Sequence, residues 1–117
     1  NVCEHSEFVT NVCSSTVFAF VVHDKPCIYY NYEQPQLKKG IRDIGQNYKY
    51  VHFRSMPSEK AAVFCTDKKD LENLVQDILD ERLSNVKEGK KWFEIVAGNA
   101  PLDASKTIWK RIDTILN

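Results

Sequence analysis

The segment from Asp67 to Leu83 constrains the fold most, because its apolar residues recur at the spacing of one helix face. The apolar positions of this segment are Leu71, Leu74, Val75, Ile78, Leu79 and Leu83. A stripe with this 3.6-residue period is typical of a helix packed against another layer of the fold. Thr66 or Asp67 can cap its first turn. The sequence therefore predicts a helix over 67–83 in which Leu74, Ile78 and Leu79 are buried against a sheet.

Five other segments are rich in β-branched and aromatic residues, which favours strands. They cover residues 16–22, 27–32, 48–56, 61–65 and 92–97. Turn residues at 23–26 connect the first two of these segments, and turn residues at 57–60 connect the next two. We therefore expect two antiparallel hairpins. A strand-helix-strand crossover would place the strand at 92–97 parallel to the strand at 61–65.

Two more helices are predicted. Leu37, Ile41 and Ile44 have helical spacing between Pro35 and Gly45. A final helix begins after Asp103 and has a regular apolar face, which we expect to be buried; it comprises Ile108, Trp109, Ile112, Ile115 and Leu116. Both Trp92 and Trp109 are expected in the core. The predicted fold class is α+β, a mixed five-stranded sheet with helices packed on it, in the order strand, strand, helix, strand, strand, helix, strand, helix.

The composition predicts one folded domain. A chain of 117 residues can bury a core of its own, and four Gly and four Pro leave little room for linkers. We expect a single compact domain over 1–117, with residues 1–14 as a loosely held N-terminal segment. The 16 basic and 16 acidic residues balance, so no global field draws the protein to DNA or to an anionic membrane. The longest apolar run, Val17 to Val22, is too short to span a bilayer, and we expect no membrane insertion.

The four cysteines leave the compartment open. An even count at Cys3, Cys13, Cys27 and Cys65 is compatible with disulfides in a secreted protein. Four free thiols are equally expected if the chain is an excised intracellular domain, where Cys27 and Cys65 would be small apolar strand residues. Both origins agree with a chain that begins at Asn1 without an initiator methionine.

The predicted strand at 48–56 has two unlike faces. Alternation places Tyr48, Tyr50, His52 and Arg54 on one side and Val51 and Phe53 on the other. Stacking rings next to a guanidinium resemble in kind the platforms that hold single-stranded bases. The structural interpretation is that tyrosines simply favour strands and half-buried sheet edges.

Further residues extend this face. Tyr30 and Tyr32 of the preceding hairpin add two rings, and Lys38, Lys39 and Arg42 add positive charge just before the strand. A neutral protein can carry such a basic patch, and phosphate contacts would follow from it. We therefore take these nine residues as candidate binding residues.

Catalysis has little support in the sequence. His5, His23 and His52 could act as proton shuttles with Glu4, Glu7, Asp24, Glu33 or Arg54, which would suit RNA cleavage. No protease-like signature surrounds Cys13 or Cys27, no glycine loop cradles a phosphate, and the cysteine spacing does not fit a zinc site. We expect no catalytic residues, no metal site and no cofactor.

The sequence is thus interpreted as a non-catalytic binding module. Its predicted partner is another protein, as in a protein–protein interaction domain or a secreted effector-like or ligand domain. The alternative function is an RNA-binding or RNA-cleaving domain that uses the aromatic and basic strand face.

Overall fold

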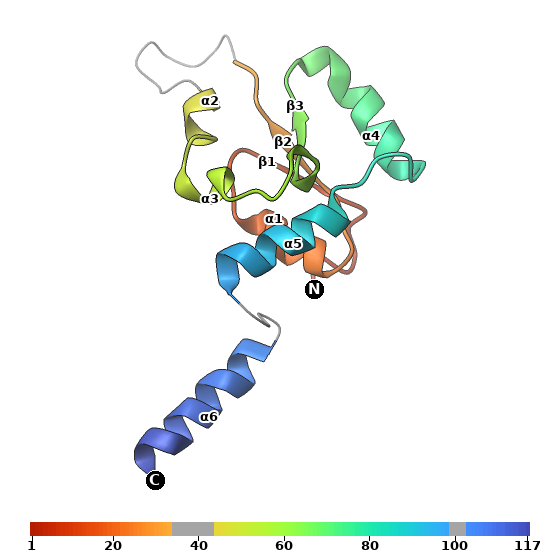
Figure 1. Cartoon of the computed structure of the whole chain (residues 1–117). Coiled ribbons are helices and arrows are strands. Elements are labelled where there is room, and N and C mark those ends of the chain that lie inside the picture. Colours follow the sequence, from red (N-terminus) through yellow and green to blue (C-terminus); the bar gives the residue numbers. More distant parts are fainter. Residues whose placement is uncertain (34–43, 99–102) are drawn as a thin grey trace.

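The computed structural model describes residues 1–33, 44–98 and 103–117, which form an α+β fold with a three-stranded parallel sheet and six helices (Figure 1). The strands are β1 (Val9–Asn11), β2 (Cys27–Tyr30) and β3 (Val63–Cys65). The helices are α1 (Thr16–Val22), α2 (Ile44–Asn47), α3 (Val51–Arg54), α4 (Leu71–Leu79), α5 (Val86–Ala97) and α6 (Ala104–Leu116). Two short 3-10 turns, Glu59–Ala61 and Lys68–Asp70, precede β3 and α4.

The sheet has the order β1-β2-β3, with β2 in the centre. Val9 is opposite Cys27 in one parallel pair, and Ile28 is opposite Val63 in the other. Parallel neighbours need a crossover between them. The segment that contains α1 joins β1 to β2, and the segment that contains α2 and α3 joins β2 to β3.

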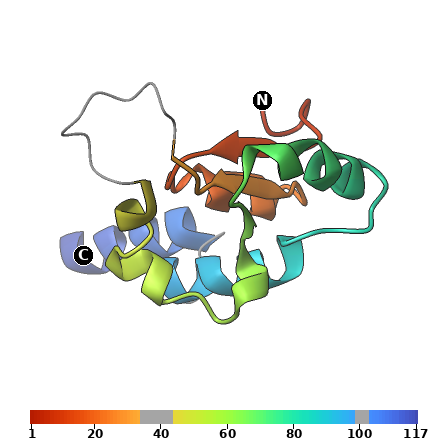
Figure 2. The same cartoon turned by 90° about the horizontal axis from the view of Figure 1, so that it is seen from above.

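Helices cover both faces of this sheet (Figures 1 and 2). On one face, Tyr29 of β2 packs with Val17 of α1, Phe53 of α3 and Trp92 of α5, all buried in one cluster. On the other face, Ile28 packs against Ile78 of α4. The alternation of side chains along β2 therefore supplies both cores.

Helices α1 and α5 approach closely at Gly89. A methyl group on Gly89 would lie 2.8 Å from Cγ1 of Val21, which is closer than such atoms approach one another. Its backbone φ is not in the left-handed region, so space rather than conformation explains the glycine. Gly89 thus lies inside α5 and at its contact with α1.

The predicted mixed five-stranded sheet is wrong. The described residues form three strands, all parallel, and neither predicted hairpin exists. The strands at 27–32 and 61–65 are present in shortened form as β2 and β3, but they pair directly with each other. Strand β1 was not predicted, because its three residues are too few to show an alternating pattern.

Residues 16–22 form α1 and not a strand. Almost every position in this segment is apolar, and such a run does not distinguish a buried strand from a buried helix. In the structure the buried positions are Val17, Phe18, Phe20 and Val21, which is the spacing of one helix face.

Two further predicted strands are also helical. Residues 48–56 form a turn followed by α3, and residues 92–97 form the second half of α5. The two segments contact each other, because the indole nitrogen of Trp92 donates a hydrogen bond to the carbonyl of His52 at 2.8 Å. Because this contact joins segments that are far apart in the chain, it leaves no periodic pattern in the sequence of either segment.

The predicted helix at 67–83 corresponds to the 3-10 turn at 68–70 and α4. Asp67 caps its start, as its side chain accepts a hydrogen bond from the backbone N–H of Lys69 at 2.9 Å. Leu74 is half-buried and Ile78 is buried, but Leu79 is 49% exposed. The prediction is therefore correct for a helix over 71–79 with Ile78 buried. It is wrong for the burial of Leu79 and for the end of the helix, since α4 stops before Leu83. The predicted helix with Leu37, Ile41 and Ile44 lies outside the described residues except for Ile44, which is the first residue of α2.

Helix α6 has the predicted position, but it stands apart from the layered body of the molecule (Figure 1). Its apolar face, expected to be buried, is exposed apart from the half-buried Ile112. None of the helices in the described residues has the length and apolarity needed to cross a membrane.

Candidate functional site

The residues predicted to form one binding face do not form one. Tyr48 points into the protein, where its ring packs edge-to-face on Tyr29, Phe53 and Phe64. Tyr50 and His52 are stacked on each other with ring centroids 6.3 Å apart, and Arg54 is exposed on α3. Tyr48 is thus separated from the stacked pair of Tyr50 and His52, and Arg54 lies about 200° around α3 from His52.

The added candidates are also dispersed. Tyr30 and Tyr32 form their own edge-to-face pair at 5.8 Å and pack on the side of the sheet that α4 covers. Lys38, Lys39 and Arg42 lie outside the described residues. Among the candidates in the described residues, Tyr50 stacks on His52, and Tyr30 contacts both Tyr32 and the hydroxyl of Tyr48.

The hydroxyl of Tyr48 has a structural role at the carboxyl end of the sheet. It donates a hydrogen bond to the carbonyl of Tyr30 and accepts one from the backbone N–H of Cys13 at 3.3 Å. The hydroxyl of Tyr29 donates to the carbonyl of Ser14 at 2.8 Å. Burial raises the pKa of Tyr48 to about 12 and raises that of Tyr29 further. Two protonated tyrosines thus hold the turn between β1 and α1.

This turn contains Cys13 in the left-handed region, at φ 45°. Besides Tyr48, the side chain of Asn11 fixes the turn by accepting a hydrogen bond from the N–H of Ser14 at 3.0 Å. The hydrogen bonds of the turn are therefore used within the fold. They account for the conformation of Cys13 without a ligand.

All four cysteines are free thiols in the structure. Cys27 and Cys65 are buried and belong to the two opposite faces of the sheet. Burial raises the pKa of Cys27 to about 12, which makes its thiol a poor nucleophile. Their placement argues against a bridge between Cys27 and Cys65, because a disulfide requires the two Cβ atoms to face each other.

The catalytic hypothesis gains no geometry from the described residues. Within residues 1–33, 44–98 and 103–117, no histidine forms an ion pair with a carboxylate, and no three metal-binding side chains gather. A proton-shuttling pair needs hydrogen-bond contact or one bridging water.

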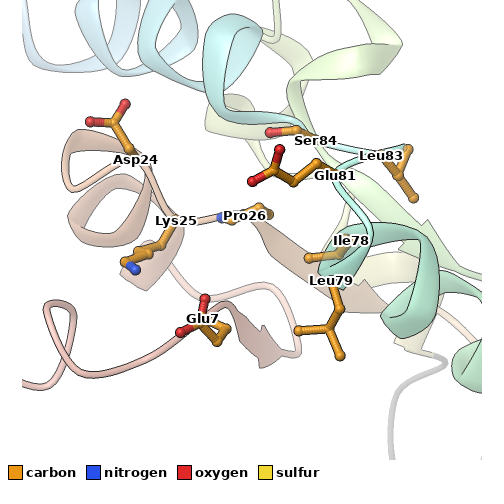
Figure 3. A pocket seen from close by; sticks show the side chains of 9 residues that line it. All are labelled: Glu7, Asp24, Lys25, Pro26, Ile78, Leu79, Glu81, Leu83 and Ser84. Atoms are coloured by element: carbon orange, nitrogen blue, oxygen red, sulfur yellow. The ribbon is translucent and has the colours of Figure 1, made fainter.

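A pocket of about 410 Å³ opens at the amino end of β1 and β2, beside the end of α4 (Figure 3). Its lining consists of Glu7, Asp24, Lys25, Pro26, Ile78, Leu79, Glu81, Leu83 and Ser84. The Asp24 carboxylate is paired with Lys90 at 2.6 Å, and this hydrogen bond and charge lower its pKa. The lining contains neither histidine nor cysteine, and it offers a mixed surface of apolar, acidic and basic side chains.

The most unusual surface of the described residues is on α6. We define the α6 stripe as Ile108, Trp109, Ile112, Ile115 and Leu116. The exposed fractions of four of its members are 57% for Ile108, 66% for Trp109, 71% for Ile115 and 77% for Leu116. Ile95 and Val96, at the end of α5, are exposed as well.

The α6 stripe has a regular geometry. At about 100° per residue, Ile112 lies at its centre, with Ile108 and Ile115 on one side and Trp109 and Leu116 on the other. The helical period of these residues predicted an apolar face, which was expected in the core. The period alone predicts an apolar face and does not say which surface covers it.

Comparison with known proteins adds no relative: no family model, no curated protein and no solved structure matches this chain.

Proposed function

We propose that this chain is a non-catalytic protein-binding module whose contact surface is the α6 stripe. The observation that carries the proposal is the exposure of four large apolar side chains along one face of a single helix. Water-soluble surfaces rarely present such a continuous apolar area without a partner.

The shape and residue types of the α6 stripe suit a protein partner. A helix that offers apolar anchors at i, i+4 and i+7 fits an apolar groove or another helix. Ile108, Ile112 and Ile115 have this spacing. Trp109 adds a large ring of the kind that dominates interface energies. Nucleic acid is a poorer fit, because α6 places no basic residue within the stripe.

The RNA alternative depended on a strand with an aromatic and basic face. That strand does not exist, and Tyr48 of the predicted face is internal. Tyr50, His52 and Arg54 remain accessible in part on α3, so RNA binding stays a prediction. No described contact favours it over a protein partner.

The test places a photoreactive amino acid at position 109, within the stripe, and at position 110, which points away from it. Exposed to light in cells that express the chain, the variant at 109 is expected to form a covalent adduct that protease removes and RNase does not. The variant at 110 is the control and is expected to form much less of it. The absence of an adduct specific to position 109, or one that RNase removes, would overturn the proposal.

A further inference from the structure

We infer that β1 is a docking site for an extended polypeptide segment, which binds beside it as a fourth strand of the sheet. The inference goes beyond the proposed function, because β1 belongs to the layered body of the molecule and α6 stands apart from it. The direction of the backbone groups along β1 is its starting point.

The backbone groups of β1 alternate in direction. The N–H of Val9 donates a hydrogen bond to the carbonyl of Pro26 at 3.0 Å, so Val9 directs its backbone groups toward β2. Successive residues of a strand direct these groups to opposite sides, and the register of Thr10 with Ile28 continues the pattern. The N–H and the C=O of Thr10 therefore point away from β2, toward the open side of β1.

The open side of β1 is unpaired. β1 ends the strand order β1-β2-β3, and within residues 1–33, 44–98 and 103–117 no strand pairs with its outer side. No hydrogen bond to the backbone of Thr10 is found in the same residues. Phe8 and Val9 are half-buried, and Val12 just after β1 is 38% exposed. A strand beside β1 would supply partners for the backbone and would cover part of these apolar side chains.

The sequence of β1 lacks the features that keep edge strands from pairing. Such features are charged side chains, above all lysine, as well as proline and bulges. Residues 8–12 read Phe-Val-Thr-Asn-Val, with no charge and no proline. The other edge strand, β3, lies between two 3-10 turns rich in charged residues, Glu59–Ala61 and Lys68–Asp70. The unprotected edge is therefore the one at β1.

The chemistry of this edge defines its occupant. A row of backbone donors and acceptors is matched along its length by another extended backbone, which is the basis of recognition by strand addition. Neighbouring strands share two faces, so the side chains of the bound segment would lie alternately beside Val9 and beside Phe8. Helices cover both faces of this sheet, and strands of such sheets are apolar at successive positions. We therefore expect an uncharged segment rich in β-branched residues.

The experiment measures amide hydrogen exchange of the full chain by NMR. The probe is a peptide of five alternating valine and threonine residues with a lysine at each end for solubility, added up to about 1 mM. Exchange at Thr10 is expected to slow about fivefold or more, because its N–H leaves water for a carbonyl of the peptide. The N–H of Val9, already bonded to Pro26, is the internal control and should change much less.

Two matched pairs test whether the backbone carries the binding. The same peptide with N-methyl groups on two neighbouring central residues keeps its side chains and loses an amide on each edge. Fluorescence anisotropy of labelled peptides is expected to show about tenfold weaker binding for the methylated form. Thr10→Pro removes the outward N–H where an edge strand tolerates proline and should weaken the unmodified peptide by a similar factor. Thr10→Val keeps this N–H and is the control.

Three results would overturn the inference: unchanged exchange at Thr10 with about 1 mM peptide, equal binding of the two peptides, or equal binding to Thr10→Pro and Thr10→Val. If Thr10→Pro does not fold, the methylated peptide decides alone. None of these results involves α6, so the adduct at position 109 tests the proposed function independently.

Discussion

At the scale of single residues, Asn85 links the start of β2 to the segment just before β3 through its side chain. It is 1% exposed. Its side-chain carbonyl accepts a hydrogen bond from the N–H of Cys27 at 2.9 Å, and its amide donates to the carbonyl of Ala61 at 3.0 Å. These two backbone groups lie at the start of β2 and just before β3. Both would otherwise be buried without a partner, which is costly.

We predict that Asn85→Ala lowers the free energy of unfolding by about 2 to 5 kcal/mol, since it leaves two buried backbone groups unsatisfied. The measurement is a denaturant melt. Asn73→Ala, at an exposed position of α4, is the matched control and should change stability by less than about 0.5 kcal/mol. Equal losses in the two variants would show that the bridge from Asn85 contributes nothing.

A second prediction at this scale concerns alkaline pH. Burial raises the pKa of Tyr48 from 10.0 to about 12, so in the folded state the neutral phenol persists where the unfolded chain would ionise. The stabilisation of the folded state that comes from this raised pKa is complete below about pH 10, and it is lost as the pH rises through about 12. Burial also raises the pKa of Tyr29, so its ionisation lowers stability at alkaline pH in the same direction.

We therefore expect part of the tyrosinate absorbance to appear only together with unfolding above pH 10. Tyr48→Phe should reduce this late part of the signal. A late signal of unchanged size in the Tyr48→Phe variant would mean that Tyr48 ionises while the protein is folded.

At the scale of elements, α4 shows how finely packing divides one apolar stripe. Ile78 packs between α4 and the sheet, with Ile28, Val63 and Cys65 in the same cluster. Its neighbour Leu79 lies 100° further around the helix, next to the open pocket. Two adjacent apolar residues thus differ in burial.

We predict that Ile78→Ala costs about 2 to 5 kcal/mol of unfolding free energy, because it leaves a cavity in the core. Leu79→Ala is the matched control and should cost less than about 1 kcal/mol, since half of its side chain is already in water. Urea melts of both variants test the pair. A cost at Leu79 as large as that at Ile78 would place Leu79 in a buried contact that the structure does not contain.

The elements also show which sequence signals were sufficient. The helix at 67–83 and the final helix were predicted from their period, and β2 and β3 from their β-branched and aromatic residues. The strand predictions at 16–22 and 92–97 failed for a common reason. Both are short and largely apolar, and such a run does not distinguish a strand from a helix.

At the scale of the whole molecule, the structure consists of a layered body and the separate helix α6. The two clusters of buried residues belong to the sheet, to α1, α3, α4 and α5 and to the segments that join them; neither contains a residue of α6. The packed core therefore lies in the body, and the α6 stripe is exposed to solvent apart from the half-buried Ile112. This separation is the basis of the proposed function.

The candidate site was only partly predictable. The sequence predicted the apolar face of α6 by residue, including Trp109, but hydrophobic spacing does not distinguish a core face from a contact surface. The face of Tyr48, Tyr50, His52 and Arg54 was predicted from strand alternation. It failed because the chain turns after Tyr48 and carries its hydroxyl inward to Tyr30 and Cys13.

The sequence by itself determined the strong local patterns, namely the stripe of α4, the face of α6, the strands β2 and β3, the balanced charge and the absence of a long apolar span. These properties depend on residues close together in the chain. Only the tertiary structure decided that the strands are parallel, that residues 16–22 and 92–97 are helical and that Asn85 is buried between Cys27 and Ala61. These outcomes depend on contacts between distant segments, where packing outweighs local preference.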